Sequence, residues 1–234
     1  MNNQKESYEK TEEYYNKYGS WYDDERISGY YEMINKKEVE IVEKYGKDKN
    51  VLEIGCGTGI ILNEVNKFAH IANGIDLSPG MLERAKEKGL QVQVANAKSI
   101  PFNDKTFDVV YSFKVLAHIP EIKETIKEAV RIVKDDGTLI LEFYNPYSMK
   151  KLTNLIYNVV KKRDVYIRYD SLNKIKSYLP EGWEIVDYCG IKVLAMGQKL
   201  STNPISMSLE KMMAGSFMKR FGGYMVVVIK KKNA

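Results

Sequence analysis

The chain has 234 residues, of which 36 are basic and 31 acidic, and a formal net charge of +5. This length suits one α/β domain with a sizeable core, whereas two independent domains would each be small. The mixed charges do not by themselves indicate a nucleic-acid-binding protein. The sequence has no long apolar run or apolar signal region, and its two cysteines form neither a disulfide framework nor a metal cluster. We expect a single cytoplasmic domain with no metal and no nucleic-acid or membrane partner, of unspecified oligomeric state.

The first segment, residues 7–24, is rich in tyrosine and helical in pattern on both sides of Gly19. Its aromatic residues recur at three- and four-residue spacings, so most of them can share one helix face. These residues are Tyr14, Tyr15, Tyr18, Trp21 and Tyr22. Two interpretations stay open for each of them: it docks the segment on the core, or it touches a ligand.

A hydrophobic strand over 51–54 runs into glycines at alternate positions, Gly55, Gly57 and Gly59. Glycine permits a sharp turn and lets backbone N–H groups approach a ligand that a side chain would block. The residues from Ile60 onward begin a helix whose N-terminus points at that ligand. A dinucleotide-binding loop requires its third glycine at position 60, so NAD is disfavoured.

Four more strands follow in order. The second ends at Asp76, where a carboxylate accepts hydrogen bonds from both ribose hydroxyls of an adenosine in folds of this kind. A helix capped by Ser78 leads to a third strand over 90–95, and a fourth strand covers 107–113. Residues 132–143 are predicted to form a turn into a fifth strand.

The part of the chain after the fifth strand is expected to cover the substrate. An amphipathic helix over 149–163 carries an apolar stripe flanked by lysines. We favour a cover helix packed on the domain over a lid that lies on a membrane surface. Further on we expect a helix over 171–179, a strand over 183–188, a methionine-rich helix over 207–218 and a last strand over 222–229. The methionines of that helix are predicted to fill gaps in the core. They are Met207, Met212, Met213 and Met218.

The glycine loop with Glu53 before it, Asp76 and the strands in this order resemble the class I (Rossmann-like) S-adenosylmethionine-dependent methyltransferases over residues 37–143. The nearest resemblance, loose outside that core, is to ubiquinone/menaquinone-type small-molecule methyltransferases. It implies a doubly wound α/β fold with a mostly parallel seven-stranded sheet whose last strand is antiparallel. It also implies an N-terminal helical lid over 1–36, a helical insertion and late helices over 144–220, and a C-terminal strand over 221–234.

The resemblance implies S-adenosylmethionine as the cofactor and assigns residues to it. These are Glu53, Gly55, Cys56, Gly57, Gly59, Asp76, Leu77, Asn96, Ala97 and Phe113, with Tyr15 and Tyr22 from the lid. Asn96 replaces the aspartate common near the adenine amine, and its amide oxygen can still accept that hydrogen bond.

A methyl sulfonium is already activated, so the reaction needs alignment, a dry pocket and in some enzymes a base. His118, after the fourth strand, is the candidate base, or else it packs the next helix. The candidate substrate residues are Tyr18, Lys114, Tyr144 and Tyr147.

We expect methyl transfer to a small molecule through an O, N or C atom. The alternatives are a membrane-associated quinone or lipid-like acceptor, a non-catalytic cofactor-binding subunit, and aminopropyl transfer. Asn145-Pro146-Tyr147 is similar to an element that grips a flipped base or a glutamine side chain, but it follows the fifth strand instead of the fourth, so that activity is disfavoured.

Overall fold

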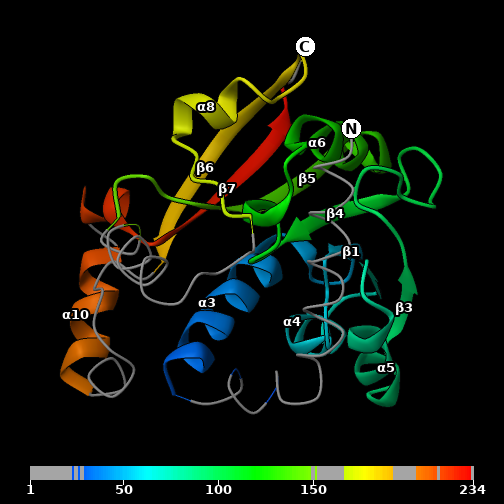
Figure 1. Cartoon of the computed structure of the whole chain (residues 1–234), viewed down its shortest axis with the longest axis horizontal. Coiled ribbons are helices and arrows are strands. Elements are labelled where there is room, and N and C mark those ends of the chain that lie inside the picture. Colours follow the sequence, from blue (N-terminus) through cyan, green and yellow to red (C-terminus); the bar gives the residue numbers. More distant parts are fainter. Residues whose placement is uncertain are drawn as a thin grey trace.

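A seven-stranded sheet forms the centre of the computed structural model (Figure 1). The structure describes residues 23, 26, 29–148, 151, 166–191, 204–214 and 217–232. Along the sheet the strand order is β3-β2-β1-β4-β5-β7-β6. The strands are β1 (Asn50–Ile54), β2 (Ile71–Asp76), β3 (Gln91–Val94), β4 (Phe107–Ser112), β5 (Val133–Tyr144), β6 (Trp183–Ile191) and β7 (Tyr224–Lys231). Strands β1 to β5 are parallel and β7 is antiparallel to both of its neighbours, which confirms the predicted fold class.

Helices cover both faces of the sheet. They are α3 (Gly29–Gly46), α4 (Ile60–Val65), α5 (Pro79–Glu87), α6 (Ile122–Ile132), α8 (Leu172–Lys176) and α10 (Pro204–Ala214), with 3-10 turns η1 (Leu116–His118) and η2 (Phe217–Phe221). None of the helices in the described part of the chain is long and apolar enough to cross a membrane.

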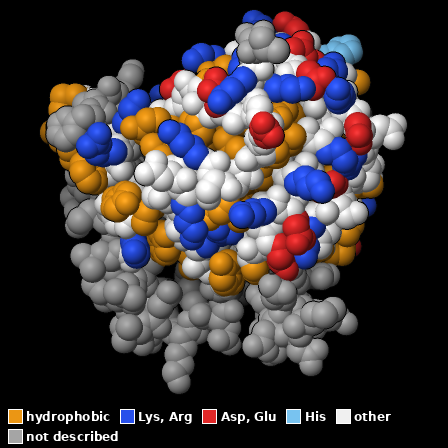
Figure 2. Space-filling view, turned by 90° about the horizontal axis from the view of Figure 1, so that it is seen from above, with side chains coloured by type: hydrophobic (Ala, Val, Ile, Leu, Met, Phe, Trp, Pro, Cys, Tyr) orange, Lys and Arg blue, Asp and Glu red, His pale blue; other side chains and the backbone are white. Residues whose placement is uncertain are grey.

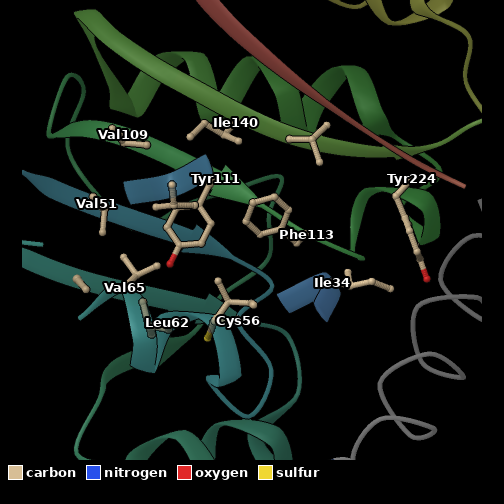
Figure 3. Close-up of a cluster of buried hydrophobic side chains, with 14 of the residues drawn as sticks. Ile34, Val51, Cys56, Leu62, Val65, Val109, Tyr111, Phe113, Ile140 and Tyr224 are labelled. Carbon is tan, nitrogen blue, oxygen red and sulfur yellow. The ribbon is translucent and has the colours of Figure 1, made fainter. Parts of the chain in front are cut away.

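The buried apolar side chains form two clusters, one on each face of the sheet. The first joins α3, α4 and α5 to the sheet through residues such as Ile34, Leu62 and Tyr111 (Figure 3). The second joins α6 and α8 to the opposite face. In β1, Val51 belongs to the first cluster and Leu52 to the second, because successive side chains of a strand point to opposite faces.

Strand order reverses at β1, since β2 and β3 continue to one side of it and β4 and β5 to the other. The crossover helices on the two sides diverge at this point, and ligands of such sheets bind in the crevice beyond the carboxyl ends of the strands. The fold therefore places a ligand site at the ends of β1, β2 and β4.

Three details differ from the predicted elements. Strand β5 begins at Val133, directly after α6, so the residues predicted as a turn belong to the strand. The pairing of β4 with β5 shifts in register between Phe107 and Val109, and the extra residues of β5 lie at this irregularity. The expected boundary between lid and core at residues 36 and 37 falls inside α3. Met212 is 65% exposed on α10, so the prediction that it fills the core is wrong.

Candidate functional site

A cleft lies at the carboxyl ends of β1, β2 and β4 and encloses about 1190 Å³ of empty space, counting the part open to solvent. Most of the residues predicted to bind cofactor line it: Glu53, Gly55, Cys56, Gly57, Asp76, Leu77, Asn96, Ala97 and Phe113. Gly59 lies just behind the lining, at the start of α4. Tyr15, Tyr18 and Tyr22 are outside the described residues.

The glycine loop is fixed by backbone contacts and open toward the cleft. The amides of Gly55 and Cys56 both donate to the Ile75 carbonyl oxygen, at 2.7 and 3.0 Å. Gly55 has φ 75°, and a Cβ there would meet Val115 at 2.2 Å, so the position requires glycine. A Cβ added to Gly57 would meet nothing within 4 Å. The loop is therefore packed on one side and leaves space for a ligand at Gly57.

Asp76 closes the end of β2 against this loop. Its Oδ2 accepts from the Gly57 amide at 2.8 Å and its Oδ1 from the Ser78 amide at 2.9 Å. Burial raises the pKa of Asp76 above its ordinary value, and these backbone N–H groups oppose the rise. A carboxylate offers about four lone-pair sites, so both oxygens can still accept from ligand hydroxyls.

The side-chain amide oxygen of Asn96 already accepts one hydrogen bond from a nearby residue. Its Oδ1 accepts from the Lys98 amide at 2.9 Å. A carbonyl oxygen has two lone pairs, so one site remains for a hydrogen bond from a ligand. Asn96 lies with Ala97 in the cleft wall beyond β3.

Buried charged groups lie beside the cleft between α3 and β4. The Lys114 ammonium donates to Glu38 Oε2 and, at 3.1 Å, to Asn35 Oδ1. Glu38 is 0% exposed, and Glu53 is 3% exposed and accepts from the Tyr111 hydroxyl at 3.3 Å. Burial raises the pKa of Glu53 well above its ordinary value, although the charge of Lys114 lowers it.

Sequence reasoning did not identify Asn35 and Glu38 as part of the site. One signal was available, because Glu38 lies four residues from both Ile34 and Val42, and all three side chains are 0% exposed. A carboxylate on the apolar stripe of a helix needs a buried partner. Here that partner is Lys114.

His118 lines the cleft from the 3-10 turn after β4. Its Nδ1 lies 2.9 Å from the Tyr166 carbonyl oxygen, which can only accept. Nδ1 therefore carries the proton, and Nε2 is the acceptor nitrogen of the neutral ring. This is the protonation that a base acting through Nε2 requires.

The structure does not bring Tyr144 and Tyr147 into the lining of the cleft. Tyr144 is 9% exposed and packs edge-on against Tyr224, with ring centroids 5.4 Å apart. Tyr147 is 69% exposed. The Asn145 side chain donates to the Arg220 and Gly222 carbonyl oxygens, at 2.6 and 3.0 Å, so it ties β5 to the entry of β7.

The N-terminal part of the chain meets the glycine loop at Asp23 and lines the cleft at Arg26, two residues that sequence reasoning did not assign to the site. Asp23 accepts from the hydroxyl of Thr58 in the glycine loop. Lys88 donates to Asp23 at 2.7 Å and to the Thr58 carbonyl at 2.8 Å. Arg26 lines the cleft, and its backbone carbonyl accepts from the Asn35 side chain at 2.9 Å. This segment is therefore attached to the loop that would hold a ligand.

The chain matches known proteins over the same elements. The family described as "Methyltransferase domain" matches residues 52–141, which run from β1 into β5. The uncharacterized protein MJ1252 of Methanocaldococcus jannaschii is 32% identical over 232 residues, covering 94% of this chain and 90% of its own. The chain belongs to the S-adenosylmethionine-dependent methyltransferases. Its cofactor is S-adenosylmethionine, as the resemblance implied.

One more relative and one solved structure extend the comparison of this methyltransferase. A ubiquinone biosynthesis O-methyltransferase of Coxiella burnetii is 26% identical over 121 residues, covering 48% of this chain and 52% of its own. The crystal structure of a possible histamine N-methyltransferase from Thermotoga maritima has a TM-score of 0.64 at 20% identity, covering 94% of this chain and 98% of its own. That likeness shows the shared fold.

The cleft of the methyltransferase fits its cofactor. Gly57 leaves space where a backbone must approach a ligand closely, and Asp76 presents two oxygens at the end of β2. The lining also includes the carboxyl group of Glu53 and the guanidinium of Arg26. These match the ammonium and the carboxylate of an amino-acid moiety in charge.

Proposed function

We propose that this methyltransferase methylates a small-molecule acceptor bound at the end of the cleft near Phe113, Lys114 and His118. The observation that carries the proposal is that one cleft includes the glycine loop, Asp76 and His118 in its lining. The cofactor supplies an activated methyl group on a sulfonium, so the protein mainly aligns the acceptor and excludes water.

In this proposal the ribose, the amino-acid moiety and the adenine of the cofactor each bind residues of suitable charge or hydrogen-bonding capacity. Asp76 accepts from the ribose hydroxyls while it keeps its bonds to the loop amides. Glu53 accepts from the α-ammonium group, and Arg26 binds the carboxylate. Asn96 uses its remaining lone pair for the adenine amine.

His118 is the proposed base for an acceptor that must lose a proton. The Tyr166 carbonyl accepts from Nδ1, so Nε2 is the ring nitrogen that would take a proton from an acceptor hydroxyl or amine. An acceptor that attacks as a neutral amine or an anion would need no base.

The test has two parts. Calorimetry should detect binding of S-adenosylmethionine and of S-adenosylhomocysteine at micromolar-scale dissociation constants, and no heat from NAD. Incubation with a cell extract and cofactor labelled in the methyl group should then yield a labelled small molecule in mass spectrometry. Binding of NAD with no binding of the adenosyl ligands would contradict the proposal.

A membrane-associated quinone or lipid-like acceptor is the second candidate. The match to a ubiquinone biosynthesis O-methyltransferase favours it, although that match covers about half of each chain. A label recovered in the lipid fraction of the extract instead of the aqueous fraction would select this candidate. Binding without any labelled product would favour a non-catalytic cofactor-binding subunit.

A further inference from the structure

We infer that Arg168 is a positioning residue for His118 and keeps the proton of its neutral ring on Nδ1. The inference rests on the proposed function, in which Nε2 of His118 takes a proton from the acceptor. Arg168 is not among the residues that line the cleft, so it acts through His118 and does not itself meet the cofactor or the acceptor.

Arg168 binds the main chain on both sides of His118. Its backbone amide donates to the Ala117 carbonyl oxygen at 2.8 Å, directly before the histidine. Its Nη1 donates to the carbonyl oxygens of Ile119 and Pro120, directly after the histidine, each at 3.3 Å. One arginine therefore holds the turn that carries His118 before and after that residue.

The ring of His118 is bound by the same segment of the chain. Its Nδ1 donates to the carbonyl oxygen of Tyr166, two residues before Arg168, at 2.9 Å. The hydrogen bonds of an imidazole decide which of its nitrogens carries the proton. A displacement of Tyr166 relative to His118 would remove this bond and allow the other tautomer. Arg168 prevents that displacement because it fixes both the turn and the segment to each other.

The guanidinium of Arg168 has an acceptor for every donor. Its Nε and Nη2 donate to the two carboxylate oxygens of Asp170, at 2.7 and 3.1 Å. Its Nη2 also donates to the hydroxyl of Tyr178 at 2.6 Å, and that hydroxyl donates to Asp170 Oδ1 at 2.7 Å. With the two carbonyl oxygens after His118, all five N–H groups are used. The side chain of Arg168 is 9% exposed and that of Asp170 is 1% exposed.

Such an ion pair is better suited to fixing a position than to stabilising the fold. Taking two charges out of water costs free energy that their attraction often fails to offset, so buried ion pairs add little net stability. The guanidinium is planar and its donors have fixed directions, so it binds this set of acceptors in one arrangement. Asp170 is attached to the end of β5, since its amide donates to the Tyr144 carbonyl oxygen at 2.9 Å. Arg168 thus connects the turn of His118 to the sheet.

The tautomer of His118 can be observed directly, because the chain has two histidines. The other, His70, is exposed and lies just before β2, at the opposite end of the sheet from the cleft, so it serves as an internal reference. In protein isotopically labelled in its histidine rings, NMR distinguishes an Nδ1–H from an Nε2–H imidazole. At about pH 8.5, where an ordinary imidazole is neutral, wild-type His118 should be in the Nδ1–H form.

Arg168→Met removes the five donors and keeps an unbranched side chain. His118 should shift toward the Nε2–H form, while the signals of His70 stay unchanged. Transfer of a labelled methyl group from S-adenosylmethionine to a cell extract should fall by about 10²-fold, since a small displacement of a reacting group has an effect of that size. Calorimetry should give the wild-type dissociation constant for S-adenosylhomocysteine, because Arg168 does not line the cleft.

Two further variants separate positioning from stability. Lys174→Met is the matched control: Lys174 is 55% exposed and pairs with the same Asp170 at 3.3 Å, but this ion pair involves neither Arg168 nor the turn of His118. Its tautomer and its methyl transfer should equal those of the wild type. Arg168→Lys keeps a charge beside Asp170 without the fork of donors, so it should shift the tautomer in the same direction as Arg168→Met and by less. This variant decides the matter if Arg168→Met does not fold.

An Nδ1–H ring in folded Arg168→Met, or an Nε2–H ring in the wild type, would overturn the inference and leave methyl transfer by the protein intact. A changed tautomer with wild-type transfer would overturn it as well, together with the assignment of His118 as the base. A wild type that neither binds S-adenosylhomocysteine nor transfers a methyl group would overturn the proposed function and the inference with it. The failures are distinguishable because the tautomer is read without ligand.

Discussion

Asp76 has two roles that a single substitution would remove together. It holds the Gly57 amide, and thereby the open side of the glycine loop, while its oxygens remain able to accept from ligand hydroxyls. A hydrogen bond to a charged group contributes about 1.5 to 3 kcal/mol. Asp76→Ala should therefore weaken binding of S-adenosylhomocysteine at least tenfold in calorimetry, whereas Asp136→Ala on the exposed part of β5 should not. An unchanged dissociation constant in Asp76→Ala would show that this residue does not hold the ribose.

His118 can be tested with a variant that keeps its hydrogen bond to Tyr166. In His118→Asn, the side-chain amide retains a donor for the Tyr166 carbonyl oxygen but lacks the Nε2 acceptor. If His118 is a base, turnover should fall by about 10² or more while the dissociation constant for S-adenosylhomocysteine stays within about twofold. Equal turnover in the variant and the wild type would assign His118 to packing of the turn before α6.

At the residue scale, the sequence was sufficient to place a residue in the cleft where that residue directly follows a strand. Gly57 and Asp76 follow directly from β1 and β2, so local spacing fixes their place in the cleft. Arg26 and Glu38 arrive from α3 or from the residues before it, and only the folded packing shows which side of that helix meets Lys114. Tyr144 is a strand-end residue for which spacing was insufficient, because its side chain packs against Tyr224 and does not line the cleft.

At the scale of elements, Asp23 attaches the part of the chain before α3 to the glycine loop. Asp23 is held by Thr58 in the glycine loop and by Lys88 after α5. Deleting residues 1–24 removes these contacts but leaves α3 and the sheet complete. We expect the truncated protein to fold with wild-type circular dichroism, to bind S-adenosylhomocysteine more weakly and to lose methyl transfer. Failure of the truncated chain to fold would show that this part belongs to the core.

A milder change tests the attachment of Asp23 itself. Asp23→Asn keeps an oxygen that can accept from Thr58 but loses the ion pair with Lys88, whose side chains are each 30% exposed. Since partly exposed ion pairs contribute at most about 1 kcal/mol, dissociation of S-adenosylhomocysteine should accelerate by no more than about fivefold in stopped-flow measurements. Acceleration beyond that would mean that Asp23 contacts the cofactor.

The predicted strands agree with the structure where the sequence has a short, mainly apolar segment. Strands β1 and β4 are buried over most of their length and have mainly apolar sequences. The start of β5 was not predicted because Asp135 and Asp136 are typical turn residues. Salt bridges from Lys105 and Lys231 to Asp135 instead let this part of the strand lie at the surface. The start of helix α3 was not predicted. Charged residues occur both before the helix and along it, so the sequence shows no change in composition at Gly29.

At the scale of the molecule, the site occupies one end of a sheet whose two faces are both covered by helices. The cleft is therefore bounded by both halves of the fold. The β1–β3 half supplies the glycine loop, Asp76 and Asn96, and the segment after β4 supplies Lys114 and His118. Basic and acidic side chains are interspersed over the face seen from above in Figure 2, in agreement with the mixed charge of the sequence. The mixed charge of this one face does not indicate an anionic polymer or an anionic membrane bound there.

Binding to vesicles separates a soluble acceptor from a membrane-embedded one. The apolar stripe of residues 152–160 lies outside the described residues, and its pattern fits either a cover helix or a lipid-facing lid. If the stripe is buried against the domain, the protein should stay in the supernatant with anionic vesicles. A lipid-facing stripe would bring the neighbouring lysines to the membrane, where each basic residue contributes about 1 kcal/mol and salt weakens adsorption.

We expect the protein to remain in the supernatant at low and high salt, and Leu155→Glu to destabilise the fold because it places a carboxylate in a buried stripe. Cosedimentation that salt reverses, and that Leu155→Glu abolishes without loss of folding, would contradict this expectation. That result would direct the search for the acceptor to membrane quinones, because an acceptor of that kind does not leave the bilayer.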